Sequence, residues 1–319
     1  MFTGISIDIH RQYFTFVRTI VAADSTAVSK YHEHLLLCDS LLSIAGVQKL
    51  AGGIANTKTL RDLNLSMCKI KNYGASFLAS AFAVNKSLHT IVLQGNPCGG
   101  NQSTKRLAFA LMRSQRLRHL YLGETNIGEG IDHFARFIET TRTLKTLDLS
   151  YNNISDEGAV SIGNAMMVNR SITSLCLKHN KIADEGLKSL AAGLVTNSFL
   201  VSLDVGGNTV GDEGFAKLCT VLSTNDNLLE LDIGDNQIGV DSAIVAADML
   251  RSNTALCTLN LSDNPIQYRG VMRVADALRI NETLQVCYVG VDSLGAEGMQ
   301  ELTNNDAVEA FWSTRLVVI

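Results

Sequence analysis

Apolar residues recur along the chain in two alternating patterns. One is a short stretch in which every second residue is apolar, as in Leu147 and Leu149 on either side of Asp148. It is followed by a longer stretch, such as residues 183–197, in which apolar residues return at steps of three and four. The first pattern predicts a half-buried strand and the second an amphipathic helix. The chain is therefore expected to alternate between strands and helices.

The two patterns belong to one repeating unit. Clear copies of its first half are LKTLDLSYNNI from Leu144 and LLELDIGDNQI from Leu228, and successive copies lie 27 to 29 residues apart. A single unit of this length cannot bury its own apolar faces, so the units must stack on one another. The first apolar position of each unit falls on Leu60, Leu88, Leu117, Leu144, Ile172, Leu200, Leu228, Leu256 and Leu284.

Stacking also predicts a shape. Strands stack about 4.8 Å apart and helices about 10 Å apart, so the helical side must follow the longer arc. The expected fold class is α/β, a curved solenoid with a parallel sheet on the concave face and helices on the convex face.

The repeated motif LxxLxLxxN, followed by xIxDEGAxxLAxxLxxN, resembles the ribonuclease-inhibitor-like class of leucine-rich-repeat proteins over residues 60–311, as nine units. A degenerate unit precedes them at 32–59. We predict one domain over residues 1–319, with residues 1–31 as an N-terminal cap and 312–319 as a C-terminal cap, because the ends of a solenoid must be covered.

The asparagine of LxxLxLxxN is expected to point inward and to bond backbone groups at the sharp bend after the strand. Cys68, Thr125 and Asp292 replace it in three units. The regular positions are Asn96, Asn152, Asn180, Asn208, Asn236 and Asn264.

Composition narrows the class of protein. With 46% hydrophobic and 18% charged residues the chain is expected to fold around a large core. A net charge of -4, with 27 basic residues that look thinly spread along the chain, argues against binding nucleic acid or membranes. Seven cysteines without a CxxC pair predict free thiols. Charged residues within the first 18 positions, including Asp8 and Arg11, argue against a signal peptide, so we expect a cytoplasmic protein.

Motifs for catalysis, metals or cofactors are not recognised. GNPCGGN from Gly95 starts like a phosphate-binding loop, but Asn101 stands where that loop needs lysine. His32 and His34 are interpreted as structural residues rather than metal ligands. We therefore predict no catalytic residue, no cofactor, no metal and no small-molecule substrate.

The outward strand positions supply the candidate site, because solenoids of this kind usually bind partners on the concave face. Carboxylates gather there in the C-terminal half, bordered by two tyrosines, and predict a surface for a basic protein partner. The alternative is that an aspartate at this position is only a solvated part of the repeat consensus. The candidate partner-binding residues are Tyr121, Asp148, Tyr151, Asp204, Glu230, Asp232, Asp235 and Asp263.

Two further features of this face have open interpretations. Gly206, Gly207, Gly234 and Gly290 either admit a close partner backbone or reflect tolerance of small residues at exposed positions. Cys176 is expected to face solvent beside Lys178, whose charge would lower the pKa of the thiol, although one exposed cysteine among seven is unremarkable.

The function expected from the sequence is a non-enzymatic scaffold that binds a protein partner on its concave face. The resemblance also admits an enzyme regulator similar to the activators of the Ran GTPase, although their acidic tail has no counterpart in AFWSTRLVVI. A third alternative is a sensor or effector module. The sequence does not specify the oligomeric state.

Overall fold

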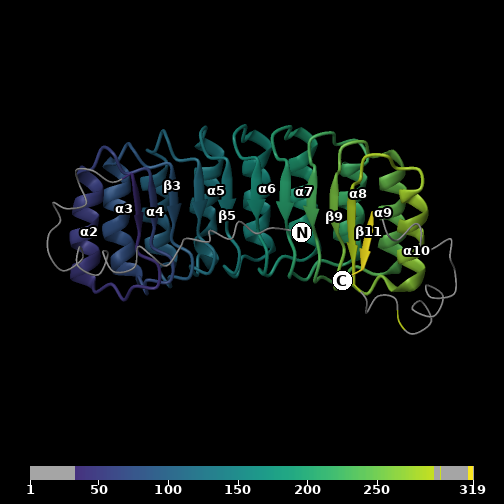
Figure 1. Ribbon diagram of the computed structural model, residues 1–319, viewed down its shortest axis with the longest axis horizontal. Coiled ribbons are helices and arrows are strands. Elements are labelled where there is room, and N and C mark those ends of the chain that lie inside the picture. Colours follow the sequence, from purple (N-terminus) through teal and green to yellow (C-terminus); the bar gives the residue numbers. More distant parts are fainter. Residues whose placement is uncertain (1–32, 291–294, 296–314, 319) are drawn as a thin grey trace.

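A computed structural model describes residues 33–290, residue 295 and residues 315–318. Figure 1 shows its strands and helices following one another in chain order along one curved row. The strands are β1 (His34–Leu36), β2 (Asp62–Asn64), β3 (Thr90–Val92), β4 (His119–Tyr121), β5 (Thr146–Asp148), β6 (Ser174–Cys176), β7 (Ser202–Asp204), β8 (Glu230–Asp232), β9 (Thr258–Asn260), β10 (Val286–Val289) and β11 (Leu316–Val318). The helices are α2 (Ile44–Asn56), α3 (Asn72–Val84), α4 (Asn101–Leu111), η2 (Gly128–Gly130), α5 (Ile131–Thr140), α6 (Asp156–Val168), α7 (Asp184–Thr196), α8 (Asp212–Leu222), α9 (Val240–Ser252) and α10 (Gln267–Leu278).

The strands form one parallel sheet in the order β1 to β11. Its register places the same position of each unit side by side, for example Leu147 beside Leu175 and Asp204 beside Asp232. Each strand is only three or four residues long, so it is held by the next strand rather than by its own length. The predicted α/β solenoid, with the sheet on one face and the helices on the other, is confirmed.

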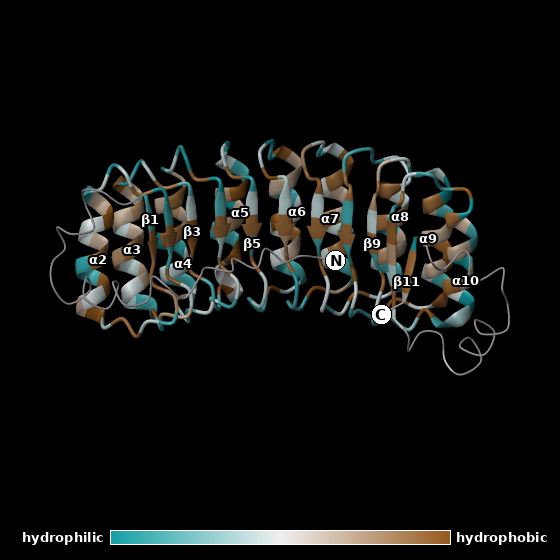
Figure 2. Cartoon of the chain, in the orientation of Figure 1, coloured by the Kyte–Doolittle hydropathy of each residue, from teal (hydrophilic) through white to brown (hydrophobic). Residues whose placement is uncertain are grey.

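The core lies between the sheet and the helices. Leu60, Leu63 and Leu65 of a single unit have no exposed surface, and each helix turns its apolar stripe toward such leucines. Figure 2 shows hydrophobic segments recurring on every strand and helix along the row. Each unit shares its core with both neighbours, as the stacking argument requires.

The inward asparagines are confirmed as a ladder that joins neighbouring units. Asn208 donates from Nδ2 to the backbone oxygens of Leu177 (3.1 Å) and Val205 (2.9 Å), and its Oδ1 accepts from the backbone N–H of Ile182 (3.1 Å). Two residues that replace the inward asparagine also donate to backbone oxygens. Cys68 Sγ donates to the oxygen of Leu37, and Thr125 Oγ1 donates to the oxygen of Leu122. Asp292 lies outside the described residues.

A second asparagine ladder, which the sequence analysis did not predict, follows the helices. Asn169 donates from Nδ2 to the backbone oxygen of Ile138 (2.6 Å), and its Oδ1 accepts from the N–H groups of Ser171 (2.9 Å) and Ile172 (2.8 Å). It thereby joins the end of its own helix to the end of the preceding one. The same donation to the preceding unit is made by Asn85, Asn197, Asn225, Asn253 and Asn281.

The aspartate of the Asp-Glu-Gly segment serves the helix of the next unit. Asp184 begins α7, yet its Oδ1 accepts hydrogen bonds from the backbone N–H groups of Gly211 (2.8 Å) and Gly214 (2.9 Å) at the start of α8. Negative charge is favoured at a helix N-terminus by the free N–H groups and the helix dipole. The carboxylate of Asp184 therefore caps the helix of the following unit, α8, and not the helix that it begins, α7.

The predicted domain limits remain predictions. Residues 1–31 lie outside the described residues. Of residues 312–319, Leu316–Val318 forms β11, which pairs in parallel with β10 and so lies at the end of the sheet.

Candidate functional site

The outward strand positions form one continuous row across the middle of the sheet. The pairing register sets Tyr121 beside Asp148, Asp148 beside Cys176, and Cys176 beside Asp204. Asp204 in turn lies beside Asp232. Four of the predicted side chains therefore share a row that only one other residue, Cys176, interrupts.

The aspartates of this row have a structural task. Asp148 Oδ1 accepts from the N–H of Ser150 (2.9 Å), and Asp204 Oδ1 accepts from the N–H of Gly206 (3.0 Å). Asn260 makes the same bond to the N–H of Ser262 in its own unit (3.0 Å). Because asparagine makes the same bond as aspartate, the bond depends on a side-chain oxygen and not on a charge. The negative charges are thus additional to what the fold requires.

Burial divides the predicted carboxylates into two groups. Asp232 is only 8% exposed, and its Oδ1 also accepts a bond from Asn260 Nδ2 (3.0 Å). Burial and the neighbouring charge of Asp232 raise the pKa of Asp204 to about 6. The interpretation of these aspartates as freely solvated is therefore wrong for Asp232, and Asp204 is half-buried.

Among the predicted carboxylates, the exposed ones are Glu230, Asp235 and Asp263. Asp235 and Asp263 occupy the position just before the inward asparagine, where the backbone has φ values of 53° and 55°. This left-handed conformation is tolerated best by glycine, asparagine and aspartate. Since the turn holds these side chains at the edge of the sheet, they are the carboxylates best placed to meet a partner.

Tyr151 and a histidine that the sequence analysis did not single out occupy the same turn position in earlier units. The ring of Tyr151, 52% exposed, lies 4.4 Å from the ring of His179. His179 Nδ1 lies 4.0 Å from Asp235 Oδ2, two units further along. The column position, which His179 shares with Tyr151 and Asp235, was the signal that could have identified it.

Gly207 allows this arrangement. A Cβ atom on Gly207 would lie 2.1 Å from His179 Nδ1, and the glycine has a φ of 64°. Gly206 and Gly234 are likewise covered, by carboxylate oxygens of Asp204 and Asp232 and by the side chain of Asn260. Both interpretations of these glycines are therefore wrong: neighbouring side chains already occupy the space above them.

Tyr121 and Cys176 are less available than expected. Burial and the charge of Asp148 raise the pKa of Tyr121, which is half-buried. Burial and the charges of Asp204 and Asp148 also raise the pKa of the Cys176 thiol, and its Sγ lies 3.5 Å from Asp204 Oδ2. The expectation that Lys178 lowers the pKa of Cys176 is wrong, because the nearby carboxylates and desolvation outweigh it.

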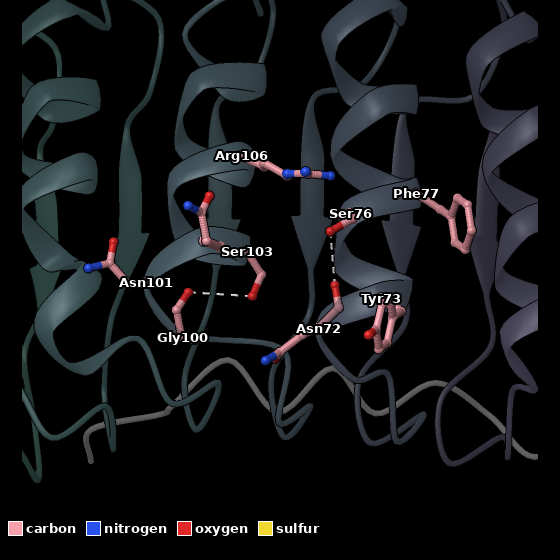
Figure 3. Close-up of a pocket in the computed structure, with 9 residues that line it drawn as sticks. Asn72, Tyr73, Ser76, Phe77, Gly100, Asn101, Ser103 and Arg106 are labelled. Carbon is pink, nitrogen blue, oxygen red and sulfur yellow. Dashed lines mark hydrogen bonds between the residues drawn. The ribbon is translucent and has the colours of Figure 1, made fainter.

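A groove of about 450 Å³ lies on the helical side, between α3 and α4 (Figure 3). Tyr73 and Phe77 line it from α3, and Arg106 lines it from α4. The hydroxyl of Ser103 donates to the backbone oxygen of Gly100 at the start of α4, within the loop that resembles a phosphate-binding segment. The lining residues bring no nucleophile next to a base.

Across the described ranges 33–290 and 315–318, no three His, Cys, Asp or Glu side chains are grouped so that they could hold a metal ion. In the same part of the chain, none of the helices has both the length and the apolar character needed to span a bilayer.

Comparison with known proteins identifies the repeats. A family profile described as Leucine Rich repeat matches residues 57–79, 141–163, 168–191, 196–219, 224–245 and 252–275. The chain is 33% identical over 132 residues to the mouse (Mus musculus) NACHT, LRR and PYD domains-containing protein 5, a match that covers 40% of this chain and 11% of the relative. It is 30% identical over 129 residues to mouse ribonuclease inhibitor, covering 40% of this chain and 28% of the relative. The alignments thus span less than a third of either relative.

Solved structures with related folds include two of different kinds. One is actin-binding site 2 of leiomodin-1, with 21% identity, a TM-score of 0.37, and coverage of 42% of this chain and 78% of that chain. The other is an internalin of Listeria monocytogenes, with 18% identity, a TM-score of 0.43, and coverage of 86% of each chain. The 28-residue units, the asparagine ladder and the six matched segments show that the chain is built from leucine-rich repeats, and these repeats are similar to those of the ribonuclease-inhibitor-like class.

Proposed function

We propose that this protein is a non-enzymatic scaffold that binds a protein partner with a basic surface across its concave face. The observation that carries the proposal is the set of exposed carboxylates Glu230, Asp235 and Asp263. Of these, Asp235 Oδ2 lies 4.0 Å from Nδ1 of His179, whose ring pairs with that of Tyr151. Carboxylates at a rim accelerate encounter with a cationic partner, and a large exposed aromatic ring is a typical anchor in an interface.

The buried carboxylates contribute to this surface indirectly. Asp204 and Asp232 lie one rung apart and are both largely withdrawn from solvent, so they add negative potential beneath the exposed group. Burial, and then repulsion from Asp232, raise the pKa of Asp204, and a nearby cation would relieve that repulsion. A lysine or arginine of a partner placed over this row would therefore be favoured.

A related protein supports the general class of function. Ribonuclease inhibitor is named for the enzyme that it inhibits, and the chain is 30% identical to the mouse protein over 129 residues. The proposal includes an intracellular location, which seven free thiols support.

The test begins with a partner captured from native lysate and continues with association kinetics. Asp235→Asn together with Asp263→Asn removes two exposed concave charges and keeps side chains that tolerate the left-handed turn. We expect association at low salt to slow by roughly tenfold and its salt dependence to weaken.

The matched control is Asp241→Asn together with Asp276→Asn, which removes two exposed charges from helices α9 and α10. Equal slowing by the two double variants would refute the concave site. If binding instead depended on the loop between Gly95 and Lys105, the partner site would move to the edge where strands lead into helices. That result would favour the enzyme-regulator alternative.

A further inference from the structure

A second charged surface lies where the helix-to-strand loops enter the sheet, in the first five units. In each of these units a lysine or arginine lies one or two residues before the first core leucine or isoleucine, and all five are exposed. These residues form a loop column: Lys58, Lys86, Arg116, Arg142 and Arg170.

A second column follows immediately, at the residue after that core position. Arg61, His89, Arg118 and Lys145 occupy it in four consecutive units. The backbone places them on neighbouring rungs, because the N–H of His89 donates to the oxygen of Arg61 (2.7 Å) and the N–H of Arg118 donates to the oxygen of His89 (2.7 Å). The N–H of Lys145 continues the series to the oxygen of Arg118 (2.7 Å).

We name the loop column and the strand-start column together the basic edge. Along the sequence these residues look thinly spread, as the composition suggested, but the 28-residue period superposes them in space. The expectation of dispersed basic residues is therefore wrong for this part of the molecule. Counterions and partners respond to the spatial arrangement and not to spacing along the chain.

Little of this charge is neutralised. Among the described residues, Arg61 is the one member of the basic edge that makes an ion pair, at 3.7 Å from Glu33. Arg142 and Arg170 donate instead to backbone oxygens at the ends of α5 and α6, such as those of Glu139 (2.8 Å) and Met167 (2.9 Å). These contacts favour a cation at a helix C-terminus, but they do not cancel its charge.

A half-buried histidine beside the edge, His119, lies in the same positive potential. The pKa of His119 is lowered by burial and then by the charge of Arg118, with His89 acting in the same direction. The negative charge of Asp62 acts in the opposite direction and raises the pKa of His119. The carboxylate of Asp62 also contacts His34, with Oδ2 at 2.6 Å from Nδ1.

The edge changes character in the last four units. The loop position that carries Lys86 and Arg142 in the first half carries Ser198, Asp226, Thr254 and Glu282 further along. The strand-start position changes from Arg118 and Lys145 to Val201 and Leu229. A long polyanion that followed the edge would therefore run from cations onto carboxylates.

We infer that the basic edge is a binding site for a short acidic protein segment in an extended conformation. Five rungs spaced about 4.8 Å apart span about 19 Å, which matches about six residues of extended chain. Charge complementarity selects an acidic segment, and the change of sign beyond Arg170 limits its length. The inference goes beyond the proposed function, because it concerns a different surface and a partner segment of opposite charge.

The probe that tests it is a fluorescein-labelled hexaglutamate peptide, followed by fluorescence anisotropy at low and physiological salt. The full chain should bind it, with affinity that falls steeply as salt increases. Arg118→Gln together with Lys145→Gln should weaken binding by about tenfold at low salt. Lys217→Gln together with Arg273→Gln removes two exposed cations from α8 and α10 and should change the affinity by less than about twofold.

Three results would overturn the inference. The first is no binding of hexaglutamate at low salt. The second is equal weakening by the two double variants, which would indicate nonspecific attraction. The third is tighter binding of a thymidine hexanucleotide than of the peptide through the same residues, which would assign the edge to nucleic acid. Asp235→Asn with Asp263→Asn should leave peptide binding intact, so failure of the concave site and failure of the basic edge are distinguishable.

Discussion

The first five units and the last four hold their backbones with the same bonds but present opposite charges. Asn96 beside β3 donates from Nδ2 to the oxygens of Leu65 and Leu93, both at 2.8 Å. Asn236 beside β8 makes the equivalent bonds to Val205 (3.2 Å) and Ile233 (3.1 Å). Above this common scaffold, one half carries the basic edge and the other carries the exposed carboxylates.

This difference separates two kinds of position in the repeat. Positions that point inward or bond the neighbouring unit are restricted to leucine, asparagine and a few substitutes, because an unpaired buried group is costly. Outward positions carry no such restriction, so their charge can vary along the row without changing the fold. A difference in outward charge between the two halves is therefore not required by the fold, and we interpret it as a feature for binding partners.

The largest expected effect tests whether the two halves share one scaffold. Asn96→Ala and Asn236→Ala should each lower the free energy of unfolding by about 2 kcal/mol, since each leaves several backbone groups without partners. Urea denaturation measures both. A cost confined to one half would show that the ladders are not equivalent.

The control for this pair is a residue beside the ladder. Gln237→Ala should cost less than about 0.5 kcal/mol, because Gln237 is exposed and follows the inward position. Asn153 also follows an inward asparagine, Asn152, but it is a poor control. Its φ is 56°, so alanine there should cost about 1 kcal/mol from backbone strain.

The next prediction concerns the cost of the negative charge on Asp204 in the second half. The pKa of Asp204 rises from 3.8 to about 6 on folding. Between these two pH values the carboxyl group is protonated in the folded protein and ionised in the unfolded chain. Its contribution to stability is present below pH 3.8 and is lost as the pH rises through about 6. Asp204→Asn cannot ionise, so it should stabilise the fold by about 1–2 kcal/mol at neutral pH and by little at acidic pH.

Thermal or urea unfolding of wild type and Asp204→Asn across this pH range measures the difference. A gain that stayed constant with pH would mean that packing, and not charge, is responsible.

The smallest expected effect concerns how helices begin in the acidic half. Asp184→Ala removes the acceptor of two backbone N–H groups at the start of α8 and should cost about 1 kcal/mol. By contrast α3 begins after Lys71, whose side chain makes no capping bond, so Lys71→Ala should cost less than about 0.3 kcal/mol. Similar costs at both positions, measured by urea denaturation, would contradict the capping role assigned to Asp184.

The sequence predicted the scaffold because the scaffold is local and repeated. The alternation around Leu147 predicts a strand, the spacing of apolar residues over 183–197 predicts a helix, and a fixed period forces neighbours to stack in order. The same period also predicted which asparagines point inward and bond backbone groups, and the structure confirms this at Asn208.

What only the tertiary structure decided depends on contacts between different units. Burial of Asp232, the ring pair of Tyr151 and His179, and the covering of Gly207 arise because a side chain of one unit leans over the next. The basic edge arises in the same way, from residues such as Arg118 and Lys145 that are distant in sequence and one rung apart in space. The sequence determines which residue occupies each position, but exposure and electrostatic potential depend on distances across units, and those distances exist only in the folded stack.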